Sequence, residues 1–145
     1  QQTTTFAFTR LEHNMIGMRK EINLSAALAI LAPKAMWSIK DNDYEQLQWY
    51  SEDFEKPSKE ALEAKVQELL IDEPYIVLRE IRDWYLRESD WTQSADIRAI
   101  RGPEWCSAWD AYRQELRDLT TTYTPYFEGD SPNIMGVVFP EKPVS

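Results

Sequence analysis

Residues 78–119, LREIRDWYLRESDWTQSADIRAIRGPEWCSAWDAYRQELRDL, contain four of the six tryptophans of this chain. Their apolar residues recur at helical spacing on both sides of a loop that carries Trp91. Gly102-Pro103 separates the loop region from the last helix, because glycine favours the end of a helix and proline favours its first position. The stretch therefore predicts two amphipathic helices that pack as an antiparallel hairpin.

The second of these helices, over residues 103–119, has a heptad-like apolar seam. The seam and the matching face of the first helix consist of Trp105, Trp109, Tyr112, Leu116 and Leu119, with Ile81, Trp84 and Tyr85 opposite. Two interpretations remain open for these residues: they form the core within one chain, or part of the seam mediates self-association. Trp91 is expected to anchor the loop against the hairpin rather than to bind a partner.

A helix–hairpin–helix pattern precedes this stretch. Residues 22–31 have leucines at helical spacing, with Asn23 or Ser25 as the expected N-cap, and this helix is expected to end before Pro33. Residues 35–40 and 47–49 alternate around an Asp/Asn turn, which predicts a β-hairpin. Its apolar face comprises Trp37, Ile39, Leu47 and Trp49. Ser58 is expected to cap the next helix, whose leucine stripe at residues 62–70 would cover the hairpin.

The triplet Asp72-Glu73-Pro74 is the expected internal boundary, because proline disfavours helix in the residue before it. We therefore predict an N-terminal arm at 1–20, a small α/β-hairpin unit at 21–73, and a helical hairpin domain with an extended tail at 74–145. The fold class is α+β, mainly α. Residues 1–10 are either an arm that orders on a partner or a frayed terminus. Phe139 is expected to anchor the extended tail.

Composition excludes several classes of function. The net charge of −9 disfavours nucleic acid and anionic membranes, and the longest apolar run is too short to span a bilayer. Cys106 is the only cysteine and His13 the only histidine, so no metal-ligand spacing occurs. Glycine-rich phosphate loops and nucleophile motifs are also missing. We therefore expect no cofactor, no metal and no enzymatic activity. Structural ion pairs are expected at Arg82–Asp83, Arg113–Asp90 and Arg117–Asp118.

A resemblance rests on three strings in this region: LREIRDWYL at 78–86, SDWTQ at 89–93, and YRQELRDL at 112–119 after Trp105. Their order and spacing resemble a motif of bacteriophage tail fibre assembly chaperones, roughly LR..R..L..SDWTQ followed by W..YRQ.LRDL. The closing Trp-Pro of that motif is Phe139-Pro140 here, and the segment before it is longer. Residues 24–70 resemble, more loosely, a short module encoded near phage tail genes.

The resemblance implies a chaperone that binds the distal part of a trimeric tail fibre and assists its folding and trimerisation. It would act in the host cytoplasm as a homo-oligomer, such as a trimer around the fibre. The candidate fibre-binding residues are Phe6, Phe8, Trp37, Ile39 and Trp49, where strand edges could pair with fibre strands. The alternative is a structural tail fibre or baseplate protein that stays in the virion.

Overall fold

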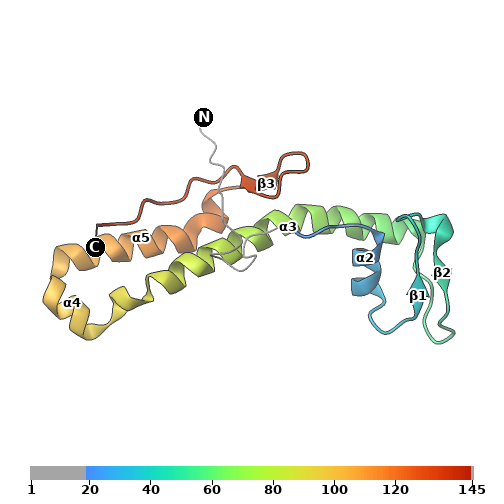
Figure 1. Ribbon diagram of the computed structural model, residues 1–145, viewed down its shortest axis with the longest axis horizontal. Coiled ribbons are helices and arrows are strands. Elements are labelled where there is room, and N and C mark those ends of the chain that lie inside the picture. The colour runs from blue at the N-terminus through green and yellow to red at the C-terminus, as the bar shows by residue number, and fades with distance from the viewer. Residues whose placement is uncertain (1–18, 145) are drawn as a thin grey trace. The chain divides into compact units, whose positions relative to one another are not determined.

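The computed structural model describes residues 19–144, which are mainly helical with two short antiparallel strand pairs (Figure 1). This confirms the predicted mainly helical α+β class. The described residues form two compact units: residues 20–73, called here the N-terminal unit, and Arg19 with residues 74–144, called the C-terminal unit. Independent folding of the predicted domains stays a prediction. Phe6 and Phe8 lie outside the described residues.

The N-terminal unit begins with helix α2, Leu24–Leu31, followed by a small hairpin. Asn23 caps α2, because its side-chain oxygen accepts a hydrogen bond from the backbone N–H of Ala26 at 3.0 Å. Strands β1, Trp37–Ser38, and β2, Gln48–Trp49, pair antiparallel. The turn between them includes the 3-10 helix η1, Tyr44–Gln46. The predicted helix and hairpin are therefore present.

The core of this unit is small and aliphatic. Its buried residues are Leu24, Ala27, Leu28, Leu47 and Leu62, and Trp37, Ile39, Tyr44, Trp49 and Val66 pack against them while partly buried. The predicted leucine stripe therefore covers the hairpin only with its first part. Leu70 is 39% exposed, although it lies on the same predicted stripe.

Helix α3, Lys59–Glu88, runs through Pro74, so the helix break expected at Asp72-Glu73-Pro74 is wrong, although the two compact units divide between Glu73 and Pro74. The predicted N-cap holds, since Ser58 Oγ accepts a hydrogen bond from the N–H of Ala61 at 3.1 Å. An interior proline costs a helix about 3 kcal/mol. Packing offsets this cost: Val77 and Leu78 are fully buried, and the Glu73 carboxylate accepts a hydrogen bond from the Lys20 N–H at 3.0 Å.

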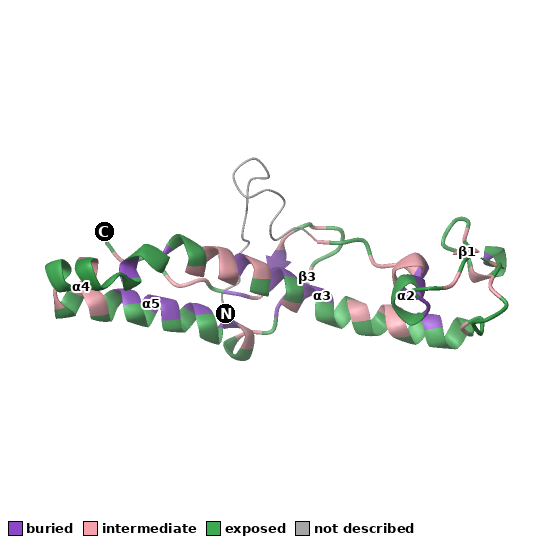
Figure 2. Cartoon of the chain, turned by 90° about the horizontal axis from the view of Figure 1, so that it is seen from below, coloured by how far each residue is buried: buried purple, intermediate pink, exposed green. Residues whose placement is uncertain are grey.

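The C-terminal unit contains the predicted antiparallel pair of helices. The 3-10 helix η2, Asp90–Gln93, and helix α4, Ala95–Arg101, connect α3 to α5, Pro103–Thr122. Gly102 precedes α5 with a φ of 88°, and Pro103 opens the helix, as the sequence predicts. Figure 1 shows α5 running back beside the last part of α3, and Figure 2 shows the buried positions along it.

The tail of the C-terminal unit includes a hairpin that the sequence did not predict. Strands β3, Tyr126–Phe127, and β4, Ile134–Met135, pair antiparallel. Ile134 and Val137 are buried in the helical core, and the ring of Phe139 lies 5.9 Å from that of Tyr85. The tail therefore packs back onto the two helices.

Candidate functional site

Arg113 clamps the end of α3 to α5 in the C-terminal unit. The residue is 8% exposed, and its side chain donates hydrogen bonds to the Leu86 carbonyl and to Ser89 Oγ, both at 2.7 Å. It also pairs with Asp90 at 3.0 Å. Ser89 Oγ in turn donates to the Tyr85 carbonyl at 2.9 Å. These bonds satisfy carbonyls at the C-terminal end of α3, so the arrangement is structural.

Of the other two expected ion pairs, one is found among the described residues. Arg82 pairs with Asp83 at 2.8 Å, whereas Arg117 donates to Gln114 and forms no ion pair with Asp118 in the described part of the chain.

An unpredicted pair joins α4 to α5, where Arg98 meets Asp110 at 2.8 Å and 3.0 Å. The hydrogen bond from the Arg98 guanidinium lowers the pKa of Asp110 below its usual value. The two residues are twelve positions apart in the chain, beyond the reach of a helical-spacing argument.

The aromatic residues around η2 enclose a cavity of about 280 Å³, called here the aromatic cavity. Its walls are Trp84, Tyr85, Glu88, Ser89, Trp91, Trp109, Tyr112, Pro140 and Lys142. The indole Nε1 of Trp109 is buried without a hydrogen-bond acceptor among the described residues. Burial raises the pKa of Tyr112 to about 12, because it disfavours the phenolate.

The candidate core or self-association residues occupy different environments. Five of them are buried in the core of the C-terminal unit: Ile81, Trp109, Tyr112, Leu116 and Leu119. Trp84, Tyr85 and Trp105 are partly buried. Trp91 packs its ring 5.6 Å from that of Trp109, as expected of a loop anchor, yet remains 44% exposed. Self-association through any of them stays a prediction.

The described fibre-binding candidates lie on the hairpin of the N-terminal unit. Trp37, Ile39 and Trp49 are only partly exposed, because they pack on the aliphatic core. Trp49 also donates its indole N–H to the Phe54 carbonyl at 2.9 Å. Their exposed neighbours were not among the candidates: Met36 is 69% and Tyr50 60% exposed.

An apolar groove of about 470 Å³ opens between the end of α2 and the hairpin. It is lined by Ala29, Ala32, Pro33, Ala35, Met36, Trp37 and Tyr50. None of these side chains carries a formal charge at neutral pH. The groove therefore presents an uncharged and largely apolar surface.

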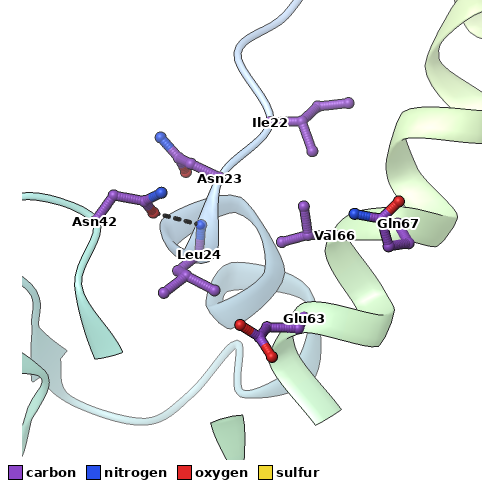
Figure 3. Close-up of a pocket in the computed structure, with 7 residues that line it drawn as sticks. All are labelled: Ile22, Asn23, Leu24, Asn42, Glu63, Val66 and Gln67. Atoms are coloured by element: carbon purple, nitrogen blue, oxygen red, sulfur yellow. Dashed lines mark hydrogen bonds between the residues drawn. The ribbon is translucent and has the colours of Figure 1, made fainter. Parts of the chain in front are cut away.

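A second pocket of the N-terminal unit, called here the Glu63 pocket, has a volume of about 460 Å³ (Figure 3). Glu63, Val66 and Gln67 come from α3, while Ile22, Asn23 and Leu24 lead into α2 and Asn42 comes from the hairpin turn. Asn42 is held there because its side-chain oxygen accepts the Leu24 N–H at 2.7 Å. Its left-handed φ of 54° is one that asparagine tolerates well.

Comparison with known proteins identifies the C-terminal unit. Residues 75–144 match the family model described as phage tail assembly chaperone protein. This region of the chain belongs to that family. The match confirms the resemblance to the tail assembly chaperone family. No curated protein and no solved structure matches the chain.

The description of the matched family indicates a chaperone role in assembly of the phage tail. Within residues 19–144, no group of three or more His, Cys, Asp or Glu side chains is arranged to hold a metal ion. No helix in the same range is long and apolar enough to cross a membrane.

The two surface sites of the N-terminal unit were not predicted as pockets. Asn23 was one of two candidate caps, beside Ser25, and residues 41–43 were predicted as a turn, but nothing in the sequence indicated that Asn23 and this turn meet Glu63. The signal was absent because the pocket combines three segments separated by about twenty residues each. Helical periodicity shows which face of a helix is apolar, but it does not show which loop lies against that face.

Proposed function

We propose that this tail assembly chaperone binds the tail fibre through its N-terminal unit and assists the folding and trimerisation of the fibre. Family membership supports the chaperone role, and the apolar groove beside the hairpin supports the location of the client site. Met36 and Tyr50 leave large apolar surfaces exposed at this groove. Unassembled fibre subunits expose apolar surface and strand edges, which a chaperone must cover to prevent aggregation.

The edge of β1 supports binding by strand addition. The Tyr50 N–H donates to the Met36 carbonyl at 2.9 Å, so residues 36 and 50 form a hydrogen-bonded pair of the antiparallel ladder. The next pair, Trp37 and Trp49, is then a non-hydrogen-bonded pair. Trp37 therefore directs its backbone N–H and carbonyl away from β2, where a fibre strand can pair with them.

A trimeric fibre offers three equivalent sites, so we propose that three copies of the chaperone act on one fibre. Holding three subunits together raises their effective concentration and favours trimerisation. Contact between chaperone copies would use the exposed part of Trp91 and the partly buried Trp105, since Trp109 and Tyr112 are already buried in the core.

Co-expression with the fibre protein tests the proposal. The soluble, trimeric fraction of the fibre is measured with the wild-type chaperone, without it, and with Met36→Asp, which places a charge in the apolar groove. We expect the fibre to aggregate without the chaperone, and Met36→Asp to reduce the soluble trimer severalfold. Ile100→Asp is the matched control, because Ile100 is 79% exposed in the other unit. A fibre that trimerises equally well without the chaperone refutes the proposal.

Mass spectrometry of purified particles distinguishes the proposed chaperone from the alternative, a structural protein of the tail. A transient chaperone is absent from the virion, whereas a structural tail component is present at a fixed ratio to the other tail proteins.

A further inference from the structure

We propose that the Glu63 pocket binds a lysine or arginine side chain of the protein that this chaperone assembles. The inference rests on the proposed function, because it takes the client to contact the N-terminal unit. It adds the chemistry of recognition: a basic side chain of the client enters a pocket with apolar walls and one carboxylate.

The walls of the pocket suit the aliphatic stem of such a side chain. Apolar surface comes from Ile22, just before α2, from Leu24 at the start of α2, and from Val66 of α3 (Figure 3). Lysine and arginine carry three or four methylene groups that pack against apolar surface while the charged end remains near water or an acceptor. The open form of the pocket fits a side chain that enters from solvent.

The charge of the pocket selects a cation. Glu63 lines it, and within residues 19–144 this carboxylate has no ion-pair partner. No lysine or arginine is among the lining residues. In the sequence, Asp41 and Asp43 flank the lining residue Asn42. Residues 20–73 contain twelve acidic residues against six lysines and no arginine, so the field of the whole unit attracts a basic partner.

An anion is the competing occupant, because the positive end of α2 points at this pocket. The helix start is already satisfied from within the chain. Leu24 N–H donates to Asn42 at 2.7 Å, and Ala26 N–H donates to Asn23 at 3.0 Å. These two caps occupy donors that an anion would need. The remaining acceptors are the Glu63 carboxylate and the Gln67 amide oxygen, which suit a cation.

Two small probes test this inference on the free chain. N-acetyl-lysine methylamide and N-acetyl-norleucine methylamide have similar stems, but only the first is charged. NMR titration of the full chain follows the side-chain amide signals of Asn23, Asn42 and Gln67. We expect the lysine probe to shift these signals at lower concentration than the norleucine probe. Glu63→Gln should weaken the lysine probe about three- to fivefold, as loss of a part-exposed ion pair does, and leave the norleucine probe unchanged.

Glu68→Gln is the matched control, since it makes the same charge change on the same helix outside the pocket. Equal affinities of the two probes overturn the inference, as do equal effects of Glu63→Gln and Glu68→Gln. Co-expression with the fibre separates this failure from that of the proposed function. If the fibre needs the chaperone but the probes bind alike, only the lysine or arginine site is wrong. If the fibre needs no chaperone, the proposed function fails whatever the probes show.

Discussion

The two units of this protein differ in what holds them together and in what they leave exposed. The C-terminal unit has a core of large aromatic and aliphatic side chains, closed by the buried Arg113 clamp. The N-terminal unit has a core of leucine and alanine with only partly buried tryptophans. It also has the apolar groove and the Glu63 pocket.

The family match lies in the C-terminal unit and not in the N-terminal unit. It covers residues 75–144, where helix ends, caps and an internal arginine define the packing. The apolar groove and the Glu63 pocket, which we propose as client sites, lie in residues 20–73, outside the match. We infer that the C-terminal unit supplies a common scaffold and that the N-terminal unit supplies specificity. The following predictions test this division, beginning with the largest effect.

Trp109→Ala should cause the largest loss of stability, about 3–5 kcal/mol, because a fully buried indole leaves a cavity that its neighbours cannot fill. Trp109 is 2% exposed, whereas Trp91 is 44% exposed. Trp91→Ala is therefore the control and should cost clearly less. Chemical denaturation measures both variants. Equal losses would show that the buried aromatic core does not dominate the stability of the C-terminal unit.

Arg113→Met should destabilise the protein by about 2–3 kcal/mol, because it removes the donor to the Leu86 carbonyl and Ser89 Oγ while keeping much of the side-chain volume. The control is Arg117→Met, whose side chain bonds only to Gln114 among the contacts described. That change should have little effect, as expected at an exposed position. If Arg113→Met is as stable as the wild type, the hydrogen bonds of Arg113 do not stabilise the packing of α3 against α5.

The raised pKa of Tyr112 predicts that the folded protein loses stability in alkaline solution. Its pKa is raised from 10.0 to about 12 in the folded protein, so the phenol ionises in the unfolded chain first. Its contribution is fully present below pH 10 and is lost as the pH rises towards 12. We expect the stability difference between wild type and Tyr112→Phe to shift by about 2 kcal/mol across this range. A stability difference that is constant with pH would show that ionisation of Tyr112 does not cause the alkaline loss of stability.

Local signals in the sequence predicted most element ends correctly. Asn23, Ser58 and Gly102-Pro103 act where their capping preferences place them, since caps depend on neighbouring residues only. The helix break predicted at Pro74 is wrong, because that prediction also used neighbouring residues only. The local cost of Pro74 is outweighed by burial of Val77 and Leu78, which depends on residues far along the chain.

The candidate sites were less predictable than the fold. The Arg113–Asp90 pair could be inferred, because both residues lie in strings that resemble the family. The Glu63 pocket could not, since its residues come from separate segments and each has an ordinary local role. The β3–β4 hairpin was also missed, because two-residue strands leave almost no alternation to detect.

The smallest predicted effect concerns Asn23, which both caps α2 and lines the Glu63 pocket. Asn23→Ala removes the acceptor for the Ala26 N–H and should cost about 1 kcal/mol. Hydrogen exchange should show the loss in α2 and leave α5 unchanged if the units are independent. Asn23→Asp keeps a cap acceptor and adds a carboxylate to the pocket, so it should retain the stability of α2 and tighten binding of the lysine probe. Faster exchange in both α2 and α5 of Asn23→Ala would show that the two units unfold together, which would remove the proposed division between scaffold and specificity.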